Sequence, residues 1–493
     1  MKKKAFNAFK NQFDDKIAFD KAIRILYSRD VGELPRLVSM AIKNVPDAVF
    51  LPQNESDIVN LYQIASQYKI PVIPRGAGSS GYGGALAYRG GVMVDLTAIR
   101  EVEKASKSSM TVTVGAGITF ANLEAFLSSK GQALKSYPSS APSATLGGWF
   151  AQGGSGIGSL KYGLFRDQVV SLRLVRPDGE VLEISGDEVG HHYELEGTTG
   201  IITSVTLNTK QTTPITPILG TFDSAGQLSD AIHTSLQETT PFTIIAGTPT
   251  FVHLRQLATG DFILPDNKYF GLFVIEGSEE GLSPFLSESI EKCGGSVEGS
   301  EEAAHEWKER FYPLRLKRLG PGLIIGESYI PIKHLTAYLA AVDQKFGSNE
   351  SSSEVTVVSK KEAAVLTYFL NDNRRRSEKL GFAWSKTFQI LKIAEKFGGR
   401  PYSTGLWLSG KARSYFGREK LQEIKEFRNS SDPSHIANPG KICDGKVRIL
   451  PFLSISAAMK MAMPLMRLGN AIFRFKRKKT HPPPTWHGRK TLG

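Results

Sequence analysis

The spacing of apolar residues changes several times along the chain, and each spacing predicts a different element. Residues 49–51 form a short apolar run of the kind found in a buried strand. Asn54 or Ser56 then stands where it can cap a helix. The residues that share the apolar face of this helix are Ile58, Leu61, Tyr62, Ala65 and Tyr68. The run "PVIP" at 71–74 predicts a second buried strand, so the three elements form a β-α-β unit.

Further strands and a helix are expected up to residue 212. "GGVMVDLTAI" at 90–99 is an apolar strand, and "TVTVGAGITFANLEAFLSSKG" at 111–131 is typical of a strand, a turn and a helix. "VSLRLVRPDGEVLEI" at 170–184 predicts a hairpin, and "GIITSVTLNTK" at 200–210 another strand. Residues 46–212 therefore read as one mixed α+β domain.

The flanking regions are less regular. Residues 1–45 read as helices, with Phe6, Phe9 and Phe13 at roughly helical spacing. Residues 213–425 mix helical and strand patterns, and "GSNESSSE" at 347–354 reads as a polar low-complexity loop.

Length and composition limit the class of protein. The chain has 493 residues, 41% of them hydrophobic and 22% charged, which predicts a folded protein of two or three domains. Its two cysteines, Cys293 and Cys443, are too few for a disulfide framework, a cysteine zinc site or an iron–sulfur cluster. A reducing cytoplasm fits this usage.

The net charge of +13 belongs to one end of the chain. Residues 445–493 contain eleven Lys and Arg and no acidic residue, so the rest of the chain is nearly neutral. This distribution, without a recognition motif in the body, argues against nucleic acid as a partner. We expect no signal peptide after "MKKKAFNAFKNQFDDK" and no transmembrane helix, since no window holds about 18 uninterrupted apolar residues.

The stretch "PVIPRGAGSSGYGGALAYRGG" at 71–91 carries seven glycines. Glycine lets backbone amides approach a phosphate closely, so the run from Arg75 to Gly84 is either a set of plain turns or a phosphate cradle. It lacks the G-x-x-x-x-G-K-[ST] pattern of a P-loop. A Rossmann site would need a helix next, and here a strand follows almost at once.

Two more glycine-rich segments favour the cradle. "SYPSSAPSATLGGWFAQGGSGIGSLKYG" at 136–163 combines glycines with many hydroxyls, and "EGTTGI" at 196–201 leads into a strand. Three such segments in one domain indicate a long polar ligand touched at several points, for which a dinucleotide or flavin is the natural candidate.

The ordered set of motifs resembles the vanillyl-alcohol-oxidase, or PCMH-type, flavoprotein family. The resemblance rests on "VPDAVFLPQNESDIVNLYQIASQYKIPVIPRGAGSSGYGGAL", on "TLGG", "LKYG" and "RD", on "EGTTGI" and on "DPSHIANPGK" at 432–441. The branch it is most similar to holds the glycolate oxidase flavin subunit and D-lactate dehydrogenases. It implies an α+β fold with a two-subdomain FAD-binding domain at 46–212 and a cap or substrate domain at 213–425. A closing segment at 426–450 would return to the FAD domain, leaving an N-terminal helical segment at 1–45 and a basic tail at 451–493.

The resemblance also implies which residues bind FAD. The cradle would hold the pyrophosphate, a second set would line the ribityl chain and the ring, and Glu196, Gly197, Gly200 and Ile201 would meet the adenosine side or the ring edge. The cradle residues are Arg75, Gly76, Ala77, Gly78, Ser79, Ser80, Gly81, Gly83 and Gly84, and the second set is Ser139, Ser140, Ser143, Thr145 and Gly148. In covalent members a histidine occupies the position of Ser79, so the FAD is expected to be noncovalent.

The chain departs from this branch in two places. Trp149 and Gly153 replace asparagines of the branch, and the second of these lies near the flavin in relatives. The metal-binding histidine motifs of the branch are replaced by "SSSEVTVVSKKEAAV" at 351–365 and "GGRPYSTGLWLSG" at 398–410, which contain no histidine. We therefore expect no metal site, and metal-assisted proton abstraction by a histidine is not expected here.

Two residues remain as catalytic candidates. Arg315, in "FYPLRLKRLGPG", matches a carboxylate-binding arginine of the branch, and a surface ion pair is the equal alternative. The lysine that accompanies it there is replaced by Ile325. Tyr402 could form an aromatic wall with Trp407 or donate a proton, and core packing is the alternative. His191 and His192 could reach the site, although a solvated pair is the simpler interpretation.

The basic tail holds Met459, Met461, Met463 and Met466 among positive charges. This pattern suits an anionic membrane surface, an acidic partner protein or packing on the body. We expect an FAD-dependent dehydrogenase that takes hydride from a 2-hydroxy acid such as glycolate or D-lactate, or from a related alcohol. By resemblance, an iron–sulfur subunit or a quinone accepts the electrons, in the cytoplasm or at the inner face of the membrane. The alternatives are another class of alcohol, or a noncatalytic electron-relay subunit.

Overall fold

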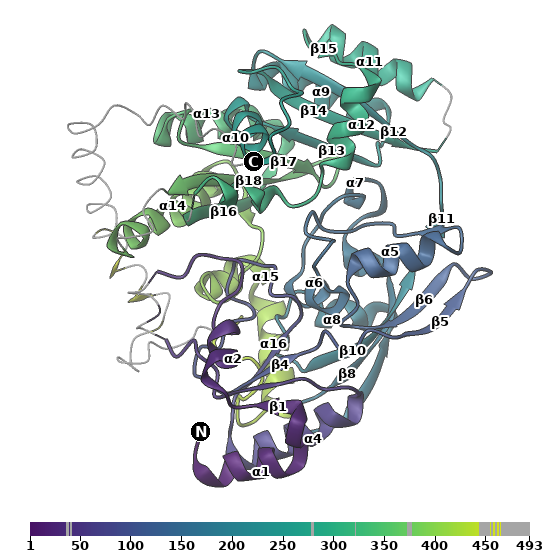
Figure 1. Ribbon diagram of the computed structural model, residues 1–493. Helices are drawn as coiled ribbons and strands as arrows, with labels where there is room; N and C mark the ends of the chain where they lie inside the picture. The colour runs from purple at the N-terminus through teal and green to yellow at the C-terminus, as the bar shows by residue number, and fades with distance from the viewer. Residues whose placement is uncertain are drawn as a thin grey trace, which may run out of the picture.

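The computed structural model describes residues 1–35, 39, 42–277, 281–320, 322–371 and 377–442, with six isolated positions between 454 and 464. For residues 371 and 377–382 it describes the backbone alone. The predicted tail at 451–493 and Cys443 therefore lie almost wholly outside the described residues. Two small sheets form one half of the molecule and a large sheet forms the other (Figure 1). The fold is α+β, as the sequence indicates.

The first sheet has the strand order β1-β2-β4-β3 and contains the β-α-β unit. Strands β2 and β3 both pair in parallel with β4, and β1 pairs antiparallel with β2. Residues 1–45 are thus not wholly helical, because β1 joins this sheet. The Asn54 side chain caps α4 by accepting from Asp57 N. The elements are α1 (Lys3–Phe13), β1 (Ile17–Ala18), α2 (Lys21–Leu26), β2 (Ala48–Phe50), α4 (Glu55–Tyr68), β3 (Val72–Arg75) and β4 (Val92–Asp95).

The second sheet is antiparallel and has the order β5-β6-β10-β8-β9. Its strands are β5 (Val102–Ser106), β6 (Thr111–Gly115), β8 (Val169–Val175), β9 (Val181–Ser185) and β10 (Ile201–Asn208). The predicted hairpin is β8–β9. Beside the sheet lie α5 (Phe120–Ser128), α6 (Leu146–Gln152), α7 (Ser159–Tyr162), α8 (Val189–His192) and the pair β7 (Gln132–Ala133) and β11 (Lys210–Gln211).

The third sheet, called the cap sheet below, has eight strands in the order β15-β12-β14-β13-β17-β18-β16-β19. They are β12 (Ile215–Phe222), β13 (Thr243–Gly247), β14 (Tyr269–Glu276), β15 (Ser296–Val297), β16 (Gly322–Pro331), β17 (Ser352–Val357), β18 (Glu362–Asn371) and β19 (Arg400–Pro401). The predicted loop at 347–354 is partly wrong, because Ser352–Glu354 already belong to β17. Buried hydroxyl pairs such as Ser353 Oγ with Thr367 Oγ1 (2.9 Å) allow these polar residues to lie inside a sheet.

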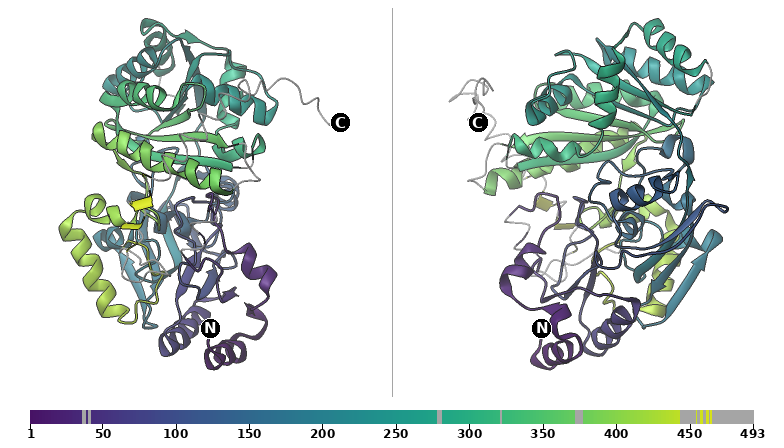
Figure 2. Two further views of the ribbon diagram at one scale, coloured as in Figure 1. Left: turned by 90° about the vertical axis from the view of Figure 1, so that its left-hand side faces the viewer. Right: turned by 45° about the vertical axis from the view of Figure 1, so that its right-hand side comes forward.

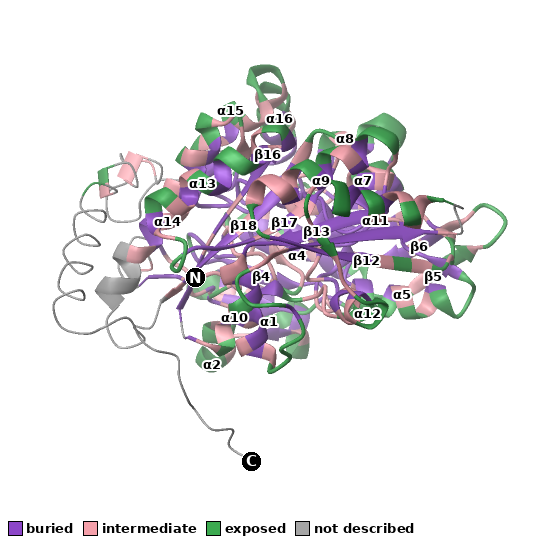
Figure 3. Cartoon of the chain, turned by 90° about the horizontal axis from the view of Figure 1, so that it is seen from above, coloured by how far each residue is buried: buried purple, intermediate pink, exposed green. Residues whose placement is uncertain are grey.

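Helices cover both faces of the cap sheet. On the side away from the first two sheets lie α9 (Ala225–Glu238), α11 (Leu282–Lys292), α13 (Leu335–Phe346) and α14 (Ser377–Lys396) (Figures 1 and 2). On the face turned toward those sheets lie α10 (Pro249–Thr259) and α12 (Ser300–Lys308). Seen from above, the central strands are buried and the helices turn exposed faces outward (Figure 3). In the part of the chain that the structure describes, no helix is both long and apolar enough to cross a bilayer.

After the cap sheet the chain returns to the first sheet. Helices α15 (Ala412–Phe416) and α16 (Arg418–Ser431) lead to residues 432–442, which run along the edge strand β3. Val72 N donates to Ile436 O and Asn438 N donates to Val72 O, both at 2.8 Å. This return places the last described segment directly behind the glycine-rich stretch that follows β3.

Candidate functional site

A cavity of about 220 Å³ lies between the two small sheets and the cap sheet. One side is formed by the three glycine-rich segments, and the facing side by β16, β17 and β18 of the cap sheet. The sequence-predicted residues that line it are Arg75, Gly76, Ala77, Gly78, Ser79, Ser80, Gly81, Gly84, Ser139, Ser140, Thr145, Gly148, Glu196, Gly197, Gly200 and Tyr402. Segments far apart in the sequence thus meet at one place.

The stretch after β3 lines this cavity and, among the described residues, leaves a run of backbone donors without protein partners. Within the described part of the chain, none of the backbone N–H groups of residues 76–81 has a protein acceptor. Gly78 has φ +65°, a conformation that glycine adopts without strain. Several amides that face a cavity without protein partners are what a phosphate needs. The residues therefore fit the pyrophosphate of the predicted FAD.

A buried carboxyl group fixes the shape of this cradle. Asp30 accepts hydrogen bonds from Gly32 N at 3.0 Å and Gly83 N at 2.8 Å. Burial raises the pKa of Asp30 to about 6, although both of these bonds lower it. Arg75 donates to the carbonyl of Arg29 at 2.8 Å, and its guanidinium lies over the Tyr27 ring. The cradle is thus held from behind by residues 27–32, which the sequence did not identify.

Two glycines are required because the segments touch. A Cβ on Gly76 would overlap the hydroxyl of Thr145 and lie 3.2 Å from the Thr145 Cβ. A Cβ on Gly84 would overlap Oε2 of Glu196 and lie 3.0 Å from its Cδ. The first glycine-rich segment therefore packs directly on the other two, which explains why the three occur together.

Glu196 lies at the bottom of the cavity in a buried polar cluster. Burial raises its pKa to about 8, while Lys441 and a hydrogen bond from the Ser403 hydroxyl at 3.2 Å lower it. Burial also lowers the pKa of Lys441 to about 7, and its Nζ donates to Leu86 O at 2.7 Å. Asn438 donates to Gly84 O at 3.0 Å and to Glu196 O at 2.5 Å. The returning segment thus joins the first and third glycine-rich segments.

Three predicted cofactor residues do not line the cavity. Gly83 turns its amide to Asp30 and lies against Leu406 and Trp407. The Ser143 hydroxyl is directed to Ser140 O at 3.5 Å, and Ile201 is buried in the core of the first sheet. Each supports a neighbour that does line the cavity.

The structure places the two catalytic candidates differently. The ring of Tyr402 lines the cavity and stacks on Tyr329 with centroids 5.2 Å apart. Its hydroxyl donates to Ser155 O at 2.8 Å, and burial raises its pKa well above the usual value. The group therefore holds the 153–157 loop and is a poor proton donor or acceptor.

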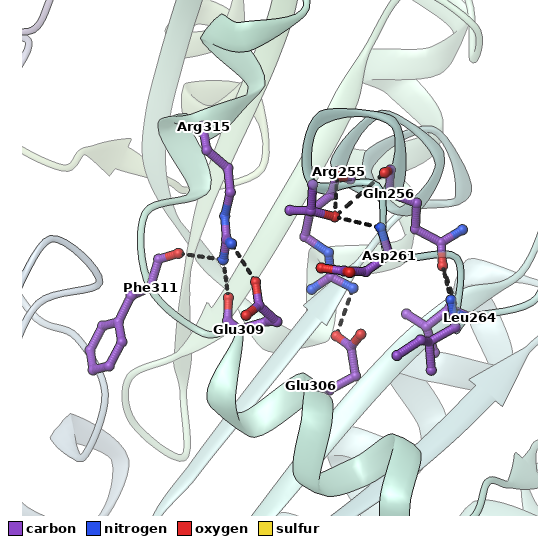
Figure 4. Close-up of polar contacts among 10 residues, drawn as sticks. Arg255, Gln256, Asp261, Leu264, Glu306, Glu309, Phe311 and Arg315 are labelled. Carbon is purple, nitrogen blue, oxygen red and sulfur yellow. Dashed lines mark hydrogen bonds and ion pairs between the residues drawn. The ribbon is translucent and has the colours of Figure 1, made fainter. Parts of the chain in front are cut away.

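Arg315 does not line the cavity. It lies in the 3₁₀ turn Pro313–Arg318 and forms an ion pair with Glu309, as Figure 4 shows. The same guanidinium donates to the carbonyls of Glu309 at 2.6 Å and Phe311 at 2.7 Å. In the structure the guanidinium of Arg315 is thus engaged in an ion pair, and its carboxylate-binding role stays a prediction.

Two carboxyl groups that sequence reasoning missed face the cavity from the cap sheet. Glu327 on β16 and Glu354 on β17 both stand opposite Leu366 of β18, so all three share one face. The Tyr82 hydroxyl donates to Glu327 Oε2 at 3.3 Å, and the Tyr368 hydroxyl donates to Glu354 Oε2 at 3.2 Å. The sequence does carry one signal for Glu354. Ser352, Glu354 and Thr356 are alternate polar residues, as on one face of a strand, and a strand predicted from residue 352 onward would have included them.

The environments of these two carboxyl groups differ. Burial, together with the charge of Glu354, raises the pKa of Glu327 to about 8, although the bond from Tyr82 lowers it. Burial raises the pKa of Glu354 to about 7, while Arg255, the bond from Tyr368 and Arg315 lower it. Two arginines thus lie behind Glu354, and each is already paired, Arg255 with Glu306 at 2.6 Å and Arg315 with Glu309 (Figure 4).

The other sequence departures are also placed. Trp149 and Ile325 line the cavity, and Gly153 lies against Glu194. His192 is buried against Phe427 and lies outside the cavity lining, and burial lowers its pKa to about 4. Among the described residues, no group of three or more His, Cys, Asp or Glu side chains could hold a metal ion.

Two family profiles match the chain. Residues 46–185 match the profile described as "FAD binding domain", and residues 221–442 match "FAD linked oxidases, C-terminal domain". The first covers two of the three glycine-rich segments, since residues 196–201 lie between the two matched ranges. The second covers the cap sheet from the end of β12 onward, with both carboxyl groups.

The chain is similar both to proteins of known sequence and to solved structures. A mitochondrial D-lactate dehydrogenase [cytochrome] of Arabidopsis thaliana is 24% identical, with 89% of this chain and 80% of the relative covered. The glycolate oxidase subunit GlcD of Bacillus subtilis is 26% identical, with 87% and 93% covered. Among solved structures, p-cresol methylhydroxylase with substrate bound has a TM-score of 0.74 at 18% identity, covering 89% of this chain and 96% of that one. Alkyldihydroxyacetonephosphate synthase has a TM-score of 0.71 at 21% identity, covering 90% and 85%.

Proposed function

Because the chain belongs to the FAD-linked oxidases of the PCMH-type, or vanillyl-alcohol-oxidase, family, we propose that it oxidises the CH–OH group of a small molecule. The observation that carries this proposal is the cavity that the glycine-rich cradle and the carboxyl-bearing face of the cap sheet line together. Two substrate classes are in question. Two relatives are named for D-lactate and glycolate, which are 2-hydroxy acids, and an uncharged alcohol is the other class.

Each wall of the cavity has a separate task in this proposal. The amides of residues 76–81 bind the pyrophosphate of FAD, and Ser139, Ser140, Thr145 and Gly148 line the cavity beyond them. The bound FAD supplies the acceptor for the hydride. Ser79 offers no imidazole at the position where a histidine tethers the flavin in covalent members, so the proposed binding is noncovalent.

The cap sheet provides the groups that a dehydrogenation needs. When an alcohol carbon loses hydride, its hydroxyl must lose a proton, and a nearby carboxylate is a competent acceptor. We assign this role to Glu354, because the charges of Arg255 and Arg315 favour its ionised form over that of Glu327. Ile325, Leu366 and Ala364 line the same wall and keep water from the reacting carbon.

The electrons must then leave the chain. Two cysteines cannot hold an iron–sulfur cluster, so we propose a separate protein or quinone acceptor. The proposed contact through the basic tail would place this acceptor on a partner subunit or at an anionic membrane surface.

The test is to load the protein with FAD and mix it anaerobically with D-lactate, glycolate, propane-1,2-diol and benzyl alcohol in turn. Bleaching of the flavin absorbance by any of them supports a dehydrogenase. Bleaching only by a reduced protein partner would contradict the proposal and favour an electron-relay subunit.

A further inference from the structure

The cap-sheet face of the cavity, called the carboxyl wall here, consists of Ile325, Glu327, Glu354, Thr356, Ala364 and Leu366. These residues come from three adjacent strands and share one face, because Glu327 and Glu354 both pair across to Leu366. Protein surrounds the two carboxyl groups except toward the cavity. The wall therefore presents two acidic side chains, one hydroxyl and an apolar strip between them.

A substrate carboxylate would find no cation on this wall. Among the described residues that line the cavity, Arg75 is the one cation, and it lies in the cradle segment with its guanidinium committed to Arg29 O and the Tyr27 ring. Arg255 and Arg315 lie behind Glu354 and are paired with Glu306 and Glu309. A buried anion without a paired cation loses its hydration for no compensating charge.

The same wall suits an uncharged hydroxyl compound. A protonated carboxyl group donates one hydrogen bond, and an ionised one accepts, so the pair can bind two hydroxyl groups or orient one. Burial raises the pKa of both groups, which favours their protonated forms and reduces the negative charge that the wall carries. Ionisation of either group would add negative charge and oppose an anionic ligand further.

We propose that the carboxyl wall selects an uncharged alcohol and disfavours a 2-hydroxy acid anion. This inference rests on the proposed function and names the substrate class for the same site. Bound FAD would serve as the oxidant and accept the electron pair of the broken C–H bond as hydride. The O–H proton passes to the carboxylate of Glu354, and the carbon–oxygen double bond of the product forms.

Matched ligand pairs test the inference without requiring turnover. Lactamide and lactate have the same shape and differ in charge, and glycolamide and glycolate form a second pair. Their dissociation constants are measured from the change in absorbance of the protein-bound flavin. We expect each amide to bind at least about tenfold more tightly than its acid. An acid that binds as tightly as its amide, in either pair, would overturn the inference.

Variants assign the preference to the wall. Glu327→Gln and Glu354→Gln keep the shape of the side chains and remove the acidic groups. Each should therefore reduce the ratio between the dissociation constants of acid and amide, and the double variant should reduce this ratio most. Glu188→Gln changes an exposed glutamate away from the cavity and serves as the matched control. An unchanged ratio in the double variant would also overturn the inference. Failure of the proposed function is recognised separately, by the absence of flavin bleaching with every CH–OH compound.

Discussion

The contact between Gly84 and Glu196 offers a quantitative test of the cradle. A Cβ at position 84 would overlap Oε2 of Glu196 and lie 3.0 Å from its Cδ. The carboxyl group has little room to retreat, since Ser403 bonds its side chain and Asn438 bonds its carbonyl. Forcing an extra methyl group into such a packed site costs about 1–3 kcal/mol. If the cradle must shift to relieve the overlap, Gly84→Ala should weaken FAD binding by about 5- to 150-fold.

The assay is a fluorescence titration of the apo-protein with FAD. Gly226→Ala is the matched control, because a Cβ there meets only the Ser224 Oγ at 3.7 Å in helix α9. We expect this control to bind FAD like the wild type. Thermal unfolding of each apo-protein separates a local effect on binding from a general loss of stability.

A double-mutant cycle identifies the cause. In a Glu196→Ala background the obstructing atoms are gone, so Gly84→Ala should have almost no further effect on FAD affinity. The two substitutions should therefore be coupled by about 1–3 kcal/mol. Equal costs of Gly84→Ala in both backgrounds would refute the packing argument, and full FAD affinity in the single variant would refute the placement of the cradle.

Three further predictions concern single residues. Arg315→Met should lower the free energy of unfolding, measured with urea, by about 3 kcal/mol or more, because it leaves Glu309 without its partner. The affinity for FAD should not change. A rise in KM for acids at unchanged stability would instead restore the carboxylate-binding role. Tyr402→Phe should lower the free energy of unfolding by about 1–3 kcal/mol, because it leaves Ser155 O unpaired, and should slow flavin reduction less than about threefold. A flavin reduction rate lower by about 10²-fold or more would show a proton-transfer role. With its pKa raised to about 8, Glu196 keeps a proton in the folded state that it loses in the unfolded state above the ordinary pKa of a glutamate. Its contribution to the free energy of unfolding therefore falls as pH rises toward 8. In urea titrations, the free energy of unfolding of Glu196→Gln should therefore rise relative to that of the wild type between pH 5 and pH 8. A difference between the two proteins that stays constant with pH would contradict the raised pKa of Glu196.

The sequence predicted the cradle well because its signals are local. A strand that ends at Arg75, a run of glycines and a second strand are all readable without tertiary information. The order of the three glycine-rich segments then indicated one ligand, and the structure brings the segments into contact through Gly76 and Gly84. The α+β class followed from the same alternation of strand and helix patterns.

The carboxyl wall could not be read in this way. "GSNESSSE" has the composition of a loop, which hides the alternation of Ser352, Glu354 and Thr356, and the pairing of β17 with β18 establishes that Glu354 lies in a strand. Glu327 lies in a mostly apolar strand, and its neighbour across the sheet is distant in sequence. The role of Asp30 was equally hidden, because it depends on the amide of Gly83, 53 residues away. Sites built by long-range pairing leave no local pattern.

The most direct measurement is an experimental structure of the protein loaded with FAD. We expect the pyrophosphate oxygens within hydrogen-bonding distance of the amides of residues 76–81, no bond from Ser79 to the flavin, and the isoalloxazine ring facing Glu327 and Glu354. FAD bound elsewhere, a covalent link to the chain, or a ring turned away from the carboxyl wall would contradict the account.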